Sequence, residues 1–164
     1  MNAATRQPAT ALIAEDEPLL AHALQADLAV VWPELKVIAH SVDGEQAIDD
    51  ALALHPEVIF MDIRMPGRSG LEAAQAIVED WPAAIPMPLL VFVTAYDQYA
   101  LQAFELAAAD YLLKPAPRDR LVQACERLRE RLAQRPAGWG EALAKTLTGN
   151  GLPREAFHRE AFEF

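Results

Sequence analysis

Polar side chains able to bind a cation or a phosphate follow short apolar runs at four points of this sequence. They are Glu15 and Asp16 after residues 11–14, Asp62 after residues 58–61, Thr94 after residues 89–93, and Lys114 after residues 111–113. Carboxylates are ligands that Mg²⁺ prefers in proteins, and an ammonium or a hydroxyl can hold phosphate oxygens. If the fold brings these groups together, they can hold a cation and a phosphoryl group.

Asp62 is the predicted reactive residue of this set. Two like charges about 4 Å apart repel by roughly 4 kcal/mol at an effective dielectric of about 20, so clustered carboxylates need a neutralising cation such as Mg²⁺. A carboxylate beside Mg²⁺ can act as nucleophile toward a phosphoryl donor and form an aspartyl phosphate. Lys114 and Thr94 would each contact one oxygen of that phosphoryl group. The predicted chemistry is therefore phosphoryl transfer to Asp62.

The elements that must position these residues can be predicted from the hydrophobic pattern. Predicted strands cover residues 11–14, 36–39, 58–62, 89–93 and 111–113, and predicted helices cover residues 18–31, 44–54, 69–80, 98–107 and 118–132. Four of the strands have no polar face, which is typical of a parallel sheet covered on both sides. The alternation predicts a doubly wound α/β domain, in which all strands deliver their carboxyl ends to one edge.

Two of the predicted helices carry N-terminal signals. Ser69 is a predicted N-cap, and Glu72 stands three residues later, where a capping box requires it. Asp97 is a predicted cap for the helix from Gln98 to Ala107.

Composition limits the classes of protein that remain. The longest uncharged stretch, residues 81–96, contains three prolines and is too short for a bilayer, so no membrane association is expected. The single Cys125 excludes an intrachain disulfide and fits a cytoplasmic location. The net charge is −10, and residues 1–117 hold 5 basic against 17 acidic residues. Such an acidic body would repel the phosphate backbone of DNA.

Three motifs resemble the receiver domain of bacterial two-component response regulators. They are Ile13-Ala14-Glu15-Asp16-Glu17-Pro18, Met61-Asp62-Ile63-Arg64-Met65-Pro66-Gly67 and Tyr111-Leu112-Leu113-Lys114-Pro115. The resemblance covers residues 9–133 and implies a five-stranded parallel sheet of order 2-1-3-4-5 with helices on both faces. It also implies that Asp62 is the phosphoacceptor for a sensor histidine kinase.

The resemblance further implies a metal site and a switch. Asp16, Asp62 and the backbone carbonyl of Arg64 would bind Mg²⁺ directly, and Glu15, where Asp is usual, would act through water. Lys114 would pair with the phosphate, and its bond to Pro115 is expected to be cis. Thr94 would move toward the phosphoryl group, and Tyr111 would turn inward behind it.

Residues 94–105 and 109–115 are similar to receivers of LytTR-type transcription regulators, which continue into a β-rich DNA-binding domain. The 30 residues after Gln134 are too few for such a domain. We therefore expect residues 134–164 to be a linker or C-terminal extension and the output domain to be absent from this chain. DNA would be bound only through such an output domain.

The leading hypothesis is a phosphorylation-controlled switch, which is not an enzyme beyond accepting and losing its own phosphoryl group. Its output would pass through residues 97–106, 111–113 and 118–129, with homodimerisation on phosphorylation. Arg118, Arg120 and Arg127 of one copy could pair with Asp97, Glu105 and Asp110 of another, although an exposed charge run of this kind is more often simply solvated. One alternative is a stand-alone module that acts by protein contact. Another is an Mg²⁺-dependent phosphatase, which would need a second acid at the position of Arg64.

Overall fold

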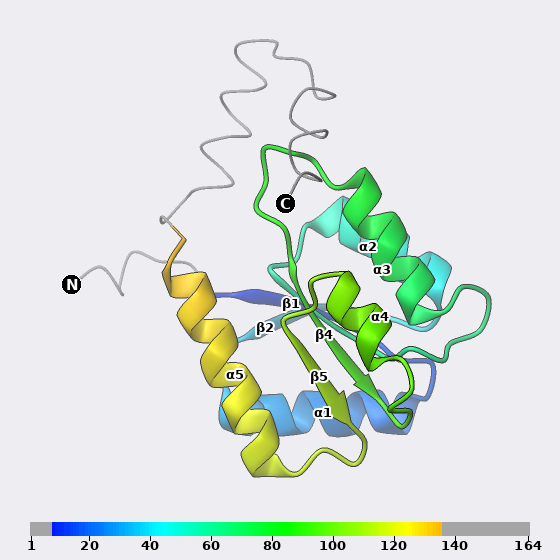
Figure 1. Cartoon of the computed structure of the whole chain (residues 1–164). Helices are drawn as coiled ribbons and strands as arrows, with labels where there is room; N and C mark the ends of the chain where they lie inside the picture. Colours follow the sequence, from blue (N-terminus) through cyan, green and yellow to red (C-terminus); the bar gives the residue numbers. More distant parts are fainter. Residues whose placement is uncertain (1–7, 136–164) are drawn as a thin grey trace.

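The computed structural model describes residues 8–135, and these residues form one five-stranded parallel sheet in the order β2-β1-β3-β4-β5 (Figure 1). The strands are β1 (Thr10–Ala14), β2 (Lys36–Ser41), β3 (Val58–Met61), β4 (Leu89–Thr94) and β5 (Asp110–Leu113). Every paired strand runs parallel to its neighbour. The predicted fold and strand order are confirmed.

Helices cover both faces of the sheet. They are α1 (Pro18–Val31), α2 (Gly44–Leu54), α3 (Gly70–Asp80), α4 (Ala100–Glu105) and α5 (Arg118–Ala133). One core cluster joins the sheet to α1 and α5, and a second joins its other face to α2, α3 and α4 (Figure 1). The domain therefore has three layers with the sheet in the middle.

The central strand β3 explains the apolar run of the sequence. Val58 and Phe60 belong to the core on the side of α1 and α5, whereas Ile59 and Met61 belong to the core on the other side. All four side chains are fully buried. A strand covered on both faces has no position for a polar residue, so the first polar residue, Asp62, comes where the strand ends.

The start of α3 matches its sequence signal. The Ser69 hydroxyl accepts a hydrogen bond from the Glu72 backbone N–H at 3.2 Å, and the Glu72 carboxylate accepts one from the Ser69 N–H at 2.9 Å. This capping box satisfies two N–H groups that the helix itself leaves unpaired. It fixes where the chain re-enters the fold after the loop that follows Asp62.

The prediction for α4 was wrong in its length and its cap. The helix has six residues, and its N-cap is Tyr99, with no side-chain hydrogen bond. Tyr111 donates its hydroxyl hydrogen bond to the Tyr96 carbonyl, and this contact holds the preceding loop outside the helix. At the other end, Ala107 has a φ of 60°, which ends the helix early.

No helix within residues 8–135 has the length and apolar character that crossing a membrane requires. A linker or extension was predicted at residues 134–164, and all of it after residue 135 lies outside the described residues.

Candidate functional site

Backbone hydrogen bonds beyond the strand ends place the predicted site residues at one edge of the sheet. The Asp62 N–H donates to the Ala14 carbonyl at 3.0 Å, so Asp62 lies beside the residues that follow β1. The Lys114 N–H donates to the Thr94 carbonyl at 2.8 Å, which continues the β4–β5 pairing by one residue. The sheet therefore delivers all five predicted side chains to its carboxyl edge.

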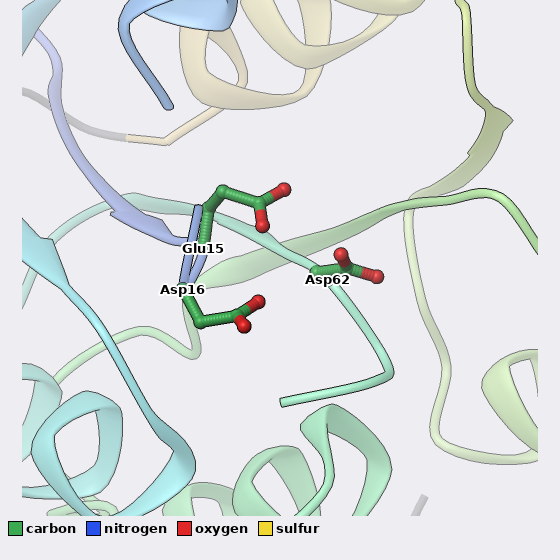
Figure 2. A group of neighbouring side chains, drawn as sticks. All are labelled: Glu15, Asp16 and Asp62. Atoms are coloured by element: carbon green, nitrogen blue, oxygen red, sulfur yellow. The ribbon is translucent and has the colours of Figure 1, made fainter. Parts of the chain in front are cut away.

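Three carboxylates meet at this edge. One oxygen from each of Glu15, Asp16 and Asp62 lies within 4.8 Å of the others, and Figure 2 shows the three side chains as neighbours where the chain leaves the strands. Glu15 is only 5% exposed and Asp62 only 8%, whereas Asp16 is half-buried. The convergence that the strand ends predicted is present in the structure.

Lys114 lies between two of these carboxylates. Its Nζ donates to Asp62 Oδ2 at 2.8 Å and also to Glu15 Oε1. The Glu15 contact was missed by the sequence reasoning, which assigned Lys114 to the phosphate alone. The greater length of Glu15 relative to the usual Asp is the sequence feature that could have indicated it. The Lys114–Pro115 bond is cis, as expected.

The surroundings of the site shift the pKa values of both Glu15 and Lys114. Burial raises the pKa of the Glu15 carboxyl, against the lowering effect of its hydrogen bond with Lys114. Burial alone would lower the pKa of Lys114, but the hydrogen bonds to Asp62 and Glu15 outweigh it, and the pKa is raised. Lys114 is therefore held in its charged form.

The donor set fits a hard divalent cation. It consists of carboxylate oxygens only, and three carboxylates face one ammonium, which leaves two negative charges when all four groups are ionised. Mg²⁺ prefers such ligands and keeps positions for water and phosphate. The residues can therefore hold a cation while Asp62 faces a phosphoryl donor.

The loop after Asp62 depends on a glycine that the sequence reasoning missed. A Cβ atom on Gly70 would lie 2.0 Å from the Asp62 carbonyl oxygen, so only glycine lets α3 start against the backbone of Asp62. The Asp62 carboxylate also accepts a hydrogen bond from the Ile63 N–H at 2.7 Å. A glycine at the first position of a helix that follows a short loop was the available signal.

The Arg64 side chain lies over the ring of Tyr96. The guanidinium carbon lies 4.5 Å from the centroid of the Tyr96 ring, a cation–π contact that joins the loops after β3 and β4. No acid stands at this position, where a phosphatase of the alternative class would need one. The metal-binding role of the Arg64 carbonyl stays a prediction.

Thr94 and Tyr111, the predicted switch pair, lie on adjacent strands. Thr94 is fully buried, and its hydroxyl accepts a weak hydrogen bond from the Tyr96 N–H at 3.4 Å. The half-buried Tyr111 ring lies 6.4 Å from the Phe92 ring, and its hydroxyl donates to the Tyr96 carbonyl. Tyr96 thus contacts both members of the pair through its backbone.

The basic residues of the predicted output face make ion pairs within the chain. Arg120 and Arg127 both contact Asp110, at 2.6 and 2.8 Å, and Arg118 contacts Asp27 at 3.0 Å. The pairs predicted between two copies would have to replace these contacts, and they stay a prediction.

Comparison with known proteins identifies the family of this site. The family model described as response regulator receiver domain matches residues 11–126. An uncharacterized response regulatory protein of Vibrio cholerae is 44% identical over 131 residues, which are 80% of this chain and 49% of that protein. The sensory transduction protein LytT of Enterococcus faecalis is 34% identical over 75% of this chain and 49% of its own length. The chain thus spans about half the length of these relatives.

Solved structures agree with this assignment. The response regulatory domain of mrkE from Klebsiella pneumoniae has a TM-score of 0.70 and 28% identity, covering 77% of this chain and 99% of that domain. The REC domain of AraT, a response regulator from Geobacillus stearothermophilus, has a TM-score of 0.69 and 31% identity, covering 77% and 97% of the two chains. Together with LytT among the relatives, these matches confirm the resemblance found in the motifs. The chain belongs to the response regulator receiver domain family and is a receiver domain of a two-component system.

Proposed function

We propose that Asp62 accepts a phosphoryl group from a sensor histidine kinase and that this modification switches the domain between two states. The observation that carries the proposal is the convergence of the Glu15, Asp16 and Asp62 carboxylate oxygens within 4.8 Å, with Lys114 bonded to Asp62. Asp62 is the nucleophile in this proposal because it follows the central strand β3 directly, and it contacts Lys114 as well as belonging to the acidic cluster.

The residues around Asp62 have distinct roles in this proposal. Asp16, Asp62 and the Arg64 carbonyl would hold Mg²⁺ directly, and Glu15 would act on it through water. The bound ion would neutralise charge on the phosphoryl oxygens. Lys114 moves its hydrogen bond from the Asp62 carboxylate to a phosphoryl oxygen, which requires only a small displacement of a side chain already in contact. An ionised carboxylate needs no general base to act as the nucleophile.

The switch would use residues that lie between the site and the surface. The Thr94 hydroxyl turns toward the phosphoryl group, and Tyr111 moves into the space behind it. Tyr111 then gives up its hydrogen bond to the Tyr96 carbonyl, which frees the loop before α4. A ligand shifts an equilibrium only if it contacts the two states differently, and the Thr94 hydroxyl supplies that difference.

The output would pass through α4, β5 and α5. Leu101 is 70% exposed and Phe104 is 77% exposed, so α4 presents apolar side chains to a partner or to a second copy. We propose that residues 9–133 form the receiver domain and that phosphorylation promotes homodimerisation of this surface. By analogy with the longer relatives, we propose that this receiver domain controls a LytTR-type output domain that binds DNA.

Acetyl phosphate with Mg²⁺, followed by intact mass measurement, tests the proposal. The wild-type chain should gain one phosphoryl group, and Asp62→Asn should gain none. A wild-type chain that gains no mass, or an Asp62→Asn variant that gains the same mass at the same rate, would overturn the proposal. Steady release of phosphate from a phosphate monoester, lost in Asp62→Asn, would support a phosphatase instead.

A further inference from the structure

A cavity of about 490 Å³ opens next to the phosphoacceptor, between α1 and the segment that joins β5 to α5. Glu15, Asp62 and Lys114, of which Lys114 contacts the other two, contribute the charged part of its lining beside the site. Most of the remaining lining is apolar and comes from α1, from the segment after β5 and from the carboxyl ends of β1, β3 and β4. The proposed function uses the charged part of this crevice and leaves its apolar part without a role.

One wall of the crevice is a stripe of α1. Leu20, Ala23, Leu24 and Asp27 follow the spacing of one helix face, and all four line the cavity. The pattern indicates a core-facing stripe, but Leu20 is 39% exposed and Ala23 is exposed as well. The neighbouring Leu19 is 82% exposed and does not belong to the lining.

The opposite wall has the same character. Pro115, Ala116 and Leu121 line it, and none of them carries a polar side chain. Asp27 is already paired with Arg118 at 3.0 Å. The crevice therefore combines a charged part, at Glu15, Asp62 and Lys114, with apolar walls and the Asp27–Arg118 ion pair.

We propose that this crevice binds the acyl group of small acyl phosphates, so that donors with apolar acyl chains phosphorylate Asp62 more efficiently than acetyl phosphate. The inference rests on the proposed phosphorylation of Asp62. A carboxylate oxygen of Asp62 forms a bond to phosphorus while the bond from phosphorus to the acyl oxygen breaks. The electron pair of that bond leaves with the acyl group as a free carboxylate, and nothing is oxidised or reduced.

The shape of the crevice suits such a donor. In-line displacement places the leaving oxygen on the far side of phosphorus from Asp62. A short acyl chain that continues from this oxygen would then lie between Leu20 and Leu24 on one side and Ala116 on the other. The ammonium of Lys114 complements the phosphoryl end, and the apolar walls complement the chain.

Butyryl phosphate and acetyl phosphate are the donors that test the inference. Their leaving carboxylates are almost equally basic, so their intrinsic reactivities hardly differ. Each methylene buried in the crevice should favour the longer donor about three- to fourfold, and two methylenes about ten- to fifteenfold. The rate of Asp62 phosphorylation, followed by intact mass at limiting donor concentration in Mg²⁺ buffer, should be about tenfold higher with butyryl phosphate.

Two variants and a binding measurement separate the crevice from general effects. Ala116→Leu fills part of the cavity and should bring the ratio of the two rates close to one, whereas Leu19→Ser should keep the wild-type ratio. Binding of propylphosphonate and methylphosphonate, which cannot transfer their phosphorus, provides a readout without chemistry. Calorimetry should show about tenfold tighter binding of propylphosphonate by the wild-type chain and no preference in Ala116→Leu.

The failures of the two proposals are distinguishable. If neither donor modifies the chain, the proposed function is wrong. If acetyl phosphate modifies Asp62 but butyryl phosphate is no faster, or if its advantage survives Ala116→Leu, the crevice does not bind an acyl chain. In that case its apolar walls are available to a side chain of a protein partner, and the inference is overturned.

Discussion

Two clusters of charged residues in this domain have opposite balances. At the carboxyl edge of the sheet, Glu15, Asp16 and Asp62 share the single ammonium of Lys114. At the start of β5, the single carboxylate of Asp110 receives hydrogen bonds from both Arg120 and Arg127. The first cluster therefore has an excess of negative charge, and the second has an excess of positive charge.

This difference separates a site from a structural contact. The Asp110 side chain is only 8% exposed, and its two arginines satisfy it completely while they tie β5 to α5. The edge cluster keeps an excess of negative charge, because three carboxylates face one ammonium, and burial raises the pKa of its Glu15 carboxyl. A buried cluster that lacks a counter-charge is prepared to receive a cation from solution.

The largest expected effect comes from removing the only cation of the edge cluster. Lys114→Met should lower the rate of phosphorylation by acetyl phosphate about 100-fold or more, because one contact to the developing charge on the phosphoryl group is lost. Intact mass against time measures this rate. Arg118→Met, which removes a cation from an exposed pair, is the matched control and should stay near the wild-type rate. Equal rates in both variants would contradict the role of Lys114.

Mg²⁺ should stabilise the folded domain through the edge cluster and not through the Asp110 cluster. At about 100 times its dissociation constant, the ion should raise the free energy of unfolding by about 2.7 kcal/mol. Asp16→Asn should lose most of this increase because it removes a ligand and a negative charge. Urea unfolding with and without Mg²⁺ measures the difference.

Asp110→Asn is the control for the Mg²⁺ measurement, since it removes a carboxylate from the other cluster. It should keep the full Mg²⁺-dependent increase. The same loss in Asp110→Asn and Asp16→Asn would show that the ion acts through the overall charge of the domain, which would remove the distinction between the clusters.

Breaking the balanced cluster should affect stability and leave the chemistry unchanged. Asp110→Asn leaves Arg120 and Arg127 without their carboxylate and should lower the free energy of unfolding by about 2 kcal/mol. Urea unfolding tests the stability, and acetyl phosphate labelling tests the rate, which should match that of the wild type. A fall in rate without a loss of stability would mean that this cluster belongs to the phosphorylation machinery.

The smallest effect is expected at an exposed pair. The Arg129–Glu34 contact is 3.2 Å long, and Glu34 is 71% exposed. Glu34→Gln should change the free energy of unfolding by about 0.5 kcal/mol or less, because water and salt screen such pairs. A loss as large as that of Asp110→Asn in the same unfolding assay would show that burial does not set the strength of these contacts.

Much of this architecture could be predicted from local pattern. The apolar runs fixed five strands, and the order of polar residues after them placed Asp16, Asp62 and Lys114 at one edge. The capping box at Ser69 was readable because its two partners stand three residues apart. Each of these predictions depends on residues close in sequence or on the rule that parallel strands end together.

What could not be predicted depends on side chains that meet across the fold. The bond from Lys114 to Glu15 joins residues 99 positions apart, and Arg120 reaches Asp110 only because α5 packs beside β5. The extent of α4 was overestimated because the Tyr111 hydroxyl holds the preceding loop outside the helix. The apolar stripe of α1 has the spacing of one helix face. That spacing alone cannot distinguish a face buried in the core from a face that lines an open crevice.

Chemical mapping of the phosphorylated residue tests the central claim most directly. After treatment with acetyl phosphate and Mg²⁺, borohydride reduction converts an aspartyl phosphate to homoserine, and peptide mass spectrometry locates it. The account predicts homoserine at position 62 and none at positions 16 or 110. Homoserine at another carboxylate, or no reduced residue in a chain that has gained the phosphoryl mass, would contradict it.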